Sequence, residues 1–358
     1  MNYLPAPAYV PGIQIYKYNL VRKIGEGKFG QVWLANDLAL QCQYAIKILN
    51  PGVPVDKRLR EAQIGHALCH NNLVRVHQAD IQGHGSDYIV VIAMDYMPNG
   101  SVVALTNPAG FLPLPDVLQV AKDILQGLEY LHANSFYHND IKPQNILIGP
   151  VGQAMLTDYG IVGVSANGQP VAAPGSYRLH MAPEVITGGQ INIQTDIYQA
   201  GLTLFRLACG LSHLRSKQAT LGWGDYFHAI QNGKLVTKND FPSFVPTRLQ
   251  SIILKAIATN PTQRFQAALE MRRAVEKLAF PGHCTVDATG QLVGTNGHNA
   301  FRFEKQATGS RKFSLASYKK NLNSGNEIRV SAFSGRDLTS SQADALLGKF
   351  IKHVVTGS

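Results

Sequence analysis

Three polar residues with complementary chemistry lie a few positions apart, just before an apolar run. In YHNDIKPQNILI, a carboxylate, an ammonium group and a carboxamide occur at Asp140, Lys142 and Asn145. A carboxylate can accept a proton, an ammonium group can offset negative charge, and an amide oxygen can bind a hard metal ion. The residue before the acid is Asn139, a neutral amide rather than a cation. Other motifs must indicate which reaction needs this set.

A glycine-rich loop lies far upstream of this stretch. IGEGKFGQV contains Gly25, Gly27 and Gly30, followed by Val32. Glycines allow a backbone to approach phosphates without Cβ clashes. A dinucleotide-binding fold would need a helix directly after the loop, but the following VWLAND has the pattern of a strand. The loop therefore favours phosphate binding on a hairpin of strands.

A lysine follows in an apolar strand pattern. Lys47 in YAIKIL is flanked by apolar residues, and an unpaired buried charge is costly. The helix expected over Asp56 to Leu68 offers Glu61 as a partner. The alternative is that the lysine extends its ammonium group into solvent.

Taken in order, these motifs resemble the protein kinase superfamily, in its eukaryotic-like (Hanks-type) serine/threonine branch and in a bacterial form. After the glycine loop, Lys47 and Glu61 come the catalytic-loop motif HNDIKPQN, then Asp158-Tyr159-Gly160, then Ala182-Pro183-Glu184. The resemblance covers Ile24 to about Leu278. Asn139 stands in place of the arginine of many members.

The resemblance implies how each residue would act. Phosphoryl transfer requires mainly positioning and charge neutralisation around the γ-phosphate. Asp140 would orient the attacking hydroxyl and accept its proton, and Lys142 would offset charge on the transferred group. Lys47, fixed by Glu61, would bind the α- and β-phosphates.

The resemblance also implies ATP and Mg²⁺ as cofactors, with Asn145 and Asp158 as metal ligands. The residues implied for ATP binding, besides Lys47, are Ile24, Gly25, Gly27, Gly30, Val32, Ala45, Met94, Asp95, Met97 and Leu147. The residues implied for a structural role are His138, Tyr159, Gly160, Asp196, which would bind the catalytic-loop backbone, and Glu184, which would pair with Arg264.

A lysine two residues after the catalytic acid matches serine/threonine kinases, so we expect an enzyme that transfers the γ-phosphate of ATP to Ser or Thr hydroxyls of proteins. The alternative is a nucleotide-binding pseudokinase that acts as a scaffold or regulator through its C-terminal segment. A small-molecule phosphotransferase is disfavoured by Ala182-Pro183-Glu184.

Three departures from the family pattern concern regulation. An arginine at position 139 would pair with a phosphate in the activation segment, whereas Asn139 predicts a segment that is ordered without phosphorylation or by a partner. Ser165, Ser176 and Tyr177 remain candidate phosphorylation sites. GSYRLHMAPE is one residue longer than the common form. Gly65 stands where the family usually has a large apolar residue. One interpretation is a loosened helix, in which case Gly65→Leu should preserve or raise activity. The other is that a neighbouring side chain fills the gap.

The order of patterns predicts an α+β, bilobal protein-kinase fold with a small extension. Residues 1–15 form an N-terminal extension, and 16–281 form the kinase domain, with a β-rich N-lobe over 16–97 and a helical C-lobe over 98–281. Helices are expected from Pro115 and at about Thr195 to Cys209, Thr247 to Ala258 and Ala267 to Leu278.

Residues 282–358 are expected to form a small accessory domain. CTVDATGQLVG, FRFEKQ, RKFSLASYK and EIRVSAF have strand patterns, and a final helix would be capped by Ser340 or Ser341. Ten Lys/Arg against five Asp/Glu leave this segment with a charge of five. Its alternating aromatic and basic residues favour a strand with one buried face over a nucleic-acid surface, and a protein partner is the alternative role.

Composition bounds the class of protein. The four cysteines lack metal or disulfide spacing, and the longest apolar run is too short to span a bilayer. The formal charge of +10 is not gathered in a dense basic run, which disfavours nucleic-acid binding. We therefore expect a soluble, cytoplasmic protein with protein substrates.

Overall fold

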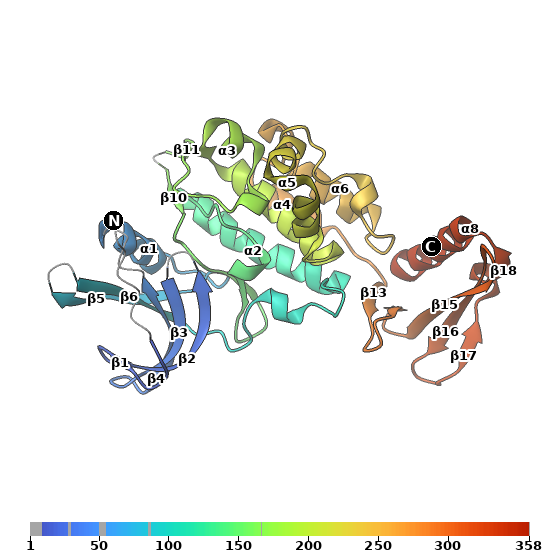
Figure 1. Ribbon diagram of the computed structural model, residues 1–358, viewed down its shortest axis with the longest axis horizontal. Coiled ribbons are helices and arrows are strands. Elements are labelled where there is room, and N and C mark those ends of the chain that lie inside the picture. Colours follow the sequence, from blue (N-terminus) through green and yellow to red (C-terminus); the bar gives the residue numbers. More distant parts are fainter. Residues whose placement is uncertain (1–8, 28–29, 50–54, 85–86, 166, 358) are drawn as a thin grey trace.

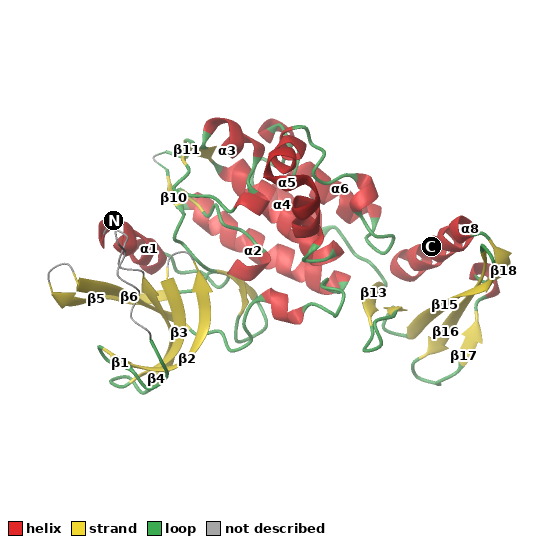
Figure 2. Cartoon of the chain, in the orientation of Figure 1, coloured by secondary structure: helices red, strands yellow, loops and turns green. Residues whose placement is uncertain are grey.

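The computed structural model describes residues 9–27, 30–49, 55–84, 87–165 and 167–357 (Figure 1). A strand-rich lobe and a helical lobe lie side by side, and a second strand-rich unit carries the C-terminus at the far end (Figure 2). The first two units are the N-lobe and C-lobe expected from the sequence, and the α+β, bilobal prediction is confirmed. The predicted extension over 1–15 lies partly outside the described residues.

The N-lobe is an antiparallel sheet in the order β1-β2-β3-β4-β6-β5 with one helix, α1, against it. Ile46 and Ile48 pack into a core on one face, which includes Tyr18 and Trp33. Alternation along the strand places Lys47 on the opposite face. The elements are β1 Gln14–Ile15, β2 Tyr18–Gly27, β3 Gly30–Asp37, β4 Cys42–Leu49, α1 Val55–Ala67, β5 Val76–His84 and β6 Asp87–Asp95.

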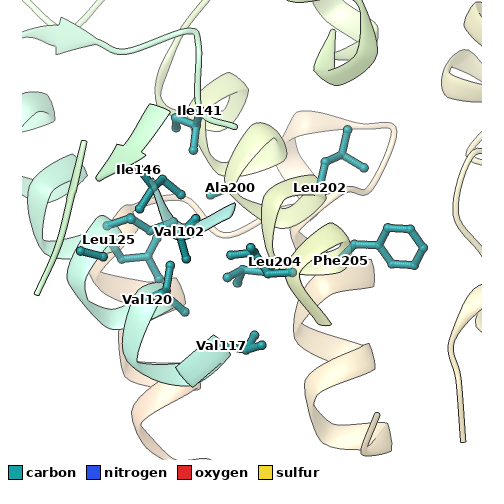
Figure 3. Close-up of a cluster of buried hydrophobic side chains, with 14 of the residues drawn as sticks. Val102, Val117, Val120, Leu125, Ile141, Ile146, Ala200, Leu202, Leu204 and Phe205 are labelled. Carbon is teal, nitrogen blue, oxygen red and sulfur yellow. The ribbon is translucent and has the colours of Figure 1, made fainter. Parts of the chain in front are cut away.

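The C-lobe is built around two buried helices, α2 and α4. Their facing side chains, with Ile141 and Ile146 from the loop between them, form one apolar cluster (Figure 3). This packing fixes the backbone on both sides of Lys142. The helices are α2 Leu114–Ala133, α3 Pro183–Gly188, α4 Ile193–Cys209, α5 His213–Gln231, α6 Thr247–Ala256 and α7 Ala268–Glu276.

Short strands connect the C-lobe helices and frame the catalytic and activation segments. Two-stranded ladders join β7 to β10, β8 to β9 and β11 to β12. These strands are β7 Phe136–Tyr137, β8 Ile146–Ile148, β9 Ala154–Leu156, β10 Gly163–Val164, β11 Val171–Ala172 and β12 Gln190–Ile191. The activation segment is thereby paired to the rest of the lobe near its start, through β10, and at its middle, through β11.

The C-terminal unit is an antiparallel sheet covered by one helix, α8. Phe301 and Leu315 are buried on the helix side, and Phe350 of α8 packs against Phe301, in agreement with strands that bury one face. The elements are β13 His283–Val286, β14 Leu292–Thr295, β15 Asn299–Gly309, β16 Lys312–Asn321, β17 Glu327–Arg329, β18 Gly335–Leu338 and α8 Ser340–Thr356.

Two local predictions in this unit were wrong. EIRVSAF is not one strand, because β17 ends at Arg329 and a short 3-10 helix spans Ser331–Phe333. The cap of α8 is Thr339 rather than either serine: its hydroxyl accepts a hydrogen bond from Gln342 N–H, and the Gln342 side chain accepts one from Thr339 N–H. This reciprocal capping box satisfies two backbone donors.

Candidate active site

A buried lysine, paired with two carboxylates, links the two lobes. Lys47 Nζ on β4 lies 2.6 Å from Glu61 Oε1 on α1 and 3.0 Å from Asp158 Oδ1 in the C-lobe. Lys47 and Glu61 are each 7% exposed. The ion pair expected from the sequence is present, and the alternative in which the lysine extends into solvent is excluded.

Lys47 and Asp158 stabilise each other's charged forms. Burial alone would lower the pKa of Lys47, but Glu61 and Asp158 raise it above its ordinary value. Burial acts in the opposite direction on Asp158, whose pKa is nevertheless lowered by the lysine. The lysine is therefore a cation and Asp158 a carboxylate at neutral pH.

The catalytic-loop residues form a second cluster around one carboxylate. Asp140 Oδ2 accepts hydrogen bonds from Lys142 Nζ at 2.7 Å and from Asn145 Nδ2 at 2.9 Å. The other oxygen of Asp140, Oδ1, is buried and has no hydrogen-bond partner among the described residues. A buried carboxylate oxygen without a donor is a costly arrangement.

Helix α4 holds the backbone of this loop. Asp196 is fully buried, and its carboxylate accepts hydrogen bonds from His138 N–H at 2.8 Å and Asn139 N–H at 2.7 Å. Gln199, one helical turn later, accepts from Ile141 N–H at 3.0 Å and donates to Asn139 O at 3.0 Å. Two side chains of one helix thus fix the backbone on both sides of Asp140.

A cavity of about 770 Å³ lies between the lobes and contains both clusters. Val32 and Ala45 contribute from the sheet and Leu147 from β8. A Cβ at Gly30 would lie 2.1 Å from Ile48 O, so a glycine is required there. The predicted residues that line the cavity are Ile24, Gly25, Gly27, Gly30, Val32, Ala45, Lys47, Glu61, Met94, Asp95, Met97, Asp140, Lys142, Asn145, Leu147, Asp158 and Tyr159.

The other predicted structural residues do not line this cavity, and they make contacts elsewhere in the two lobes. Arg264 is buried and forms two hydrogen bonds to Glu184, Nη1 to Oε1 and Nη2 to Oε2, both 2.8 Å long. The His138 ring is fully buried and lies 6.0 Å from the Tyr159 ring. A Cβ at Gly160 would lie 3.2 Å from Glu61 Oε2, so a larger residue would crowd the glutamate.

The space beside Gly65 is filled, which decides between the two sequence-based alternatives. A Cβ on Gly65 would lie 2.4 Å from Val76 Cγ2 and 3.0 Å from Tyr159 Cδ2. The Tyr159 hydroxyl donates to Val74 O at 2.9 Å, which fixes the ring. The small residue in α1 and the large aromatic residue before Gly160 therefore complement each other.

Gly65→Leu is consequently expected to reduce activity, because the open gap on which the contrary prediction depended is not present. Overpacking costs about 1 to 3 kcal/mol, and the displaced helix would move Glu61 away from Lys47. We expect kcat to fall about tenfold or more in a phosphotransfer assay. His66→Leu, on the exposed side of the same helix, is the matched control and should retain wild-type activity. Full activity of a folded Gly65→Leu variant would contradict this packing account.

Several residues of the site were not found from the sequence. Tyr177 was named only as a candidate phosphorylation site, but its ring lies 4.5 Å from Lys142 Nζ, which itself donates to Asp140. Thr195 is another, because its hydroxyl donates to Glu184 Oε1 at 2.8 Å. Gln199 could have been found, since it lies three residues after Asp196 and so on the same helical face. Tyr177 carries no comparable signal in its spacing.

Among the described residues, no group of three or more His, Cys, Asp or Glu side chains is arranged to hold a metal ion. The metal ligands predicted here are instead an amide and a carboxylate, Asn145 and Asp158. In the same part of the chain, no helix is long and apolar enough to cross a membrane.

The two lobes thus place a lysine-glutamate pair and a loop with Asp, Lys and Asn around one cavity. A family model described as "Protein kinase domain" matches residues 18–275. The chain belongs to the protein kinase family, whose members generally use ATP and Mg²⁺.

Individual relatives agree with this assignment. The chain is 30% identical over 272 residues to the serine/threonine-protein kinase PrkC of Bacillus subtilis, covering 74% of this chain and 40% of the relative. It is 27% identical over 269 residues to the serine/threonine-protein kinase PknB of Mycobacterium leprae, covering 72% and 42%. The chain thus spans less than half the length of these relatives.

Proposed function

We propose that the protein is an ATP- and Mg²⁺-dependent serine/threonine protein kinase that transfers the γ-phosphate to hydroxyls of proteins. The observation that carries this proposal is the juxtaposition of the two polar clusters in one cavity, with Asp140 Oδ1 buried and without a partner. A protein hydroxyl would donate to this oxygen, attack the γ-phosphorus and lose its proton to the carboxylate, while ADP leaves.

The other residues would orient ATP and offset its charge. Lys47, kept charged by its two carboxylate partners, would bind the α- and β-phosphates. Lys142 would interact with the transferred phosphoryl group, and Leu147 would contact the adenine together with the residues of the sheet.

The donor set fits Mg²⁺, which prefers oxygen ligands. The Nδ2 of Asn145 donates to Asp140, which leaves its amide oxygen for a metal ion, and Asp158 supplies a carboxylate beside Lys47. These two residues would hold the metal, which supplies charge neutralisation on the phosphates.

A nucleotide-binding scaffold without activity is the alternative. Such a protein has no need of a buried, unsatisfied carboxylate oxygen beside a lysine, so the geometry of Asp140 and Lys142 disfavours it. The test is incubation with ATP labelled on the γ-phosphate, with Mg²⁺ or with EDTA, followed by mapping of the acceptor residues. Label on Ser or Thr that requires Mg²⁺ supports the kinase, whereas binding of ATP without any transfer supports the scaffold.

We propose further that activity does not depend on phosphorylation of the activation segment. Asn139 is fully buried with φ 62°, a conformation that Asn tolerates better than most residues. Its Nδ2 donates to Ile161 O at 3.2 Å and to Gly175 O at 2.9 Å. One amide thus joins the catalytic loop to an early and a late position of the segment, which a phosphate-arginine pair would otherwise hold.

Two results are expected from this arrangement. The enzyme is first treated with a phosphatase until mass spectrometry detects no phosphate on Ser165, Ser176 or Tyr177. This dephosphorylated enzyme should keep its activity in its first turnovers. Asn139→Asp preserves the shape of the side chain but replaces the Nδ2 donor by an oxygen, which would face the carbonyls of Ile161 and Gly175. Each carbonyl left without a donor costs about 1 to 3 kcal/mol. We therefore expect kcat/KM to fall about tenfold or more.

Asn323→Asp, in an exposed turn of the C-terminal unit, is the control for the change of charge and should retain wild-type kcat/KM. Dephosphorylated enzyme without activity, restored by phosphorylation of the segment, would refute the proposed independence.

The C-terminal unit, residues 282–358, would serve as a docking surface for a protein partner. Its sheet and helix pack against the C-lobe rather than near the cavity: Cys284 and Phe350 belong to the same apolar cluster as α2 and α4. Asn107 Nδ2 donates to Thr285 Oγ1 at 3.4 Å across this contact. The domain boundary near residue 281 stays a prediction.

A further inference from the structure

A buried arginine beside the activation segment lacks a carboxylate partner. Arg206, in the last turn of α4, is 3% exposed. Its Nε donates to Leu211 O at 3.1 Å and its Nη1 to His180 Nε2 at 3.1 Å. Among the described residues, no Asp or Glu oxygen lies within 4.0 Å of it, in contrast to Arg264, which binds Glu184. The end of the helix attracts a cation but supplies no full counter-charge.

The histidine that binds Arg206 does not compensate its charge. His180 is fully buried, and its Nδ1 lies 2.8 Å from Ile141 O, a carbonyl that can only accept. The proton is therefore on Nδ1, and Nε2 is the acceptor of the arginine. Burial and the neighbouring arginine lower the pKa of His180 well below its ordinary value, so the ring is neutral.

Two exposed arginines add positive charge at the same place. The guanidinium of Arg178, from the activation segment, lies 5.7 Å from the centre of the Trp223 ring on α5. Arg215 lies in the helical segment of α5 before the kink at Gly222, and its positive charge contributes to lowering the pKa of Arg206. The exposed Asp225 forms no ion pair with them in the described part of the chain.

This positive region adjoins the place where a substrate hydroxyl would enter. Tyr177 connects the two: its ring lies 4.5 Å from Lys142 Nζ and 5.3 Å from the ring of His180, which binds Arg206, and it directly precedes Arg178 in the chain. A peptide whose hydroxyl reaches Asp140 would therefore have neighbouring residues near the arginines.

We infer that this kinase prefers substrates with an acidic residue close to the acceptor Ser or Thr, bound beside Arg178, Arg206 and Arg215. This inference rests on the proposed function. An acidic side chain would be attracted by the exposed Arg178 and Arg215 and by the uncompensated charge of the buried Arg206 behind them, and a basic one would be repelled. Charge complementarity of this kind sets specificity as much as affinity.

The test is a peptide library with one Ser or Thr acceptor and Asp, Ala or Lys at each flanking position, phosphorylated by the full chain with ATP and Mg²⁺. At one or more positions we expect kcat/KM to be about tenfold higher with Asp than with Lys. In Arg178→Glu/Arg215→Glu, both changes being at exposed residues, this ratio should fall to one or invert. Arg248→Glu/Arg273→Glu, an equal change of charge at exposed residues of α6 and α7, should keep the wild-type ratio.

The outcomes separate the two proposals. Phosphorylated peptides without a preference for acid, or an acid preference that the double variant retains, would overturn the inference and leave the kinase function intact. Absence of transfer to every peptide and to the chain itself would contradict the proposed function, and the inference with it.

Discussion

Replacing Asp140 by asparagine should nearly abolish phosphotransfer. The variant keeps the shape of the side chain but cannot accept the proton of the attacking hydroxyl, a contribution of about 10²- to 10⁴-fold for a general base. Because position 140 then carries no carboxylate to take up the proton of the hydroxyl, we expect kcat to decrease by a factor within this range. ATP affinity, measured by calorimetry, should change little, since the nucleotide is bound mainly by Lys47 and the walls of the cavity.

Asp337→Asn is the matched control for this substitution. Asp337 is exposed in β18 with φ 55°, which asparagine also adopts, and it is remote in the fold from the cavity (Figure 1). The kcat of the Asp337→Asn variant should equal that of the wild type. If Asp140→Asn retained more than about a tenth of wild-type kcat, Asp140 would not be the base.

Arg264→Met should be the most destabilising of the changes considered. The arginine side chain is fully buried and binds both oxygens of Glu184, so its removal leaves a carboxylate with its strongest partner missing. Breaking a buried ion pair costs about 3 to 5 kcal/mol. For a domain of this size, this corresponds to a fall in Tm on the order of 10 °C.

Arg272→Met provides the comparison, because Arg272 also binds carboxylates, those of Glu129 and Glu276, but is 19% exposed. A solvated pair contributes about 0 to 1 kcal/mol, so thermal unfolding should shift by no more than a few degrees. Equal shifts in the two variants would show that burial does not determine the contribution of these arginines.

The sequence predicted the site well where a residue's chemistry restricts its neighbours. A lysine in an apolar strand requires an acid, so Lys47 and Glu61 could be paired before their distance was known. The order and spacing of the kinase motifs likewise predicted that Asp140, Asn145 and Asp158 would line one cavity, as they do. The bilobal fold followed from a change of hydrophobic period near Pro115, where α2 begins one residue earlier at Leu114.

Prediction failed where two distant segments determine the outcome together. Gly65 alone indicated a gap, but Val76 and Tyr159 fill it, and only the packing of three elements shows this. The helix α5 was missed because Gly222, with φ 73°, interrupts its periodic pattern. From the sequence alone, Thr339, Ser340 and Ser341 are equally suitable as the N-cap residue of α8. Only the position of Gln342 in the structure distinguishes Thr339 from the two serines.

The most direct test of the central claim is transfer of the labelled γ-phosphate of ATP by the wild-type chain and by Asp158→Ala, with Mg²⁺ present. Asp158 is a proposed metal ligand and a partner of Lys47, so both proteins should first be shown to be folded by their unfolding temperatures. We predict that the wild type labels Ser or Thr residues of itself or of a peptide library, and that the variant does not. Transfer by neither protein, with ATP bound to the wild type, or equal transfer by both, would contradict the account.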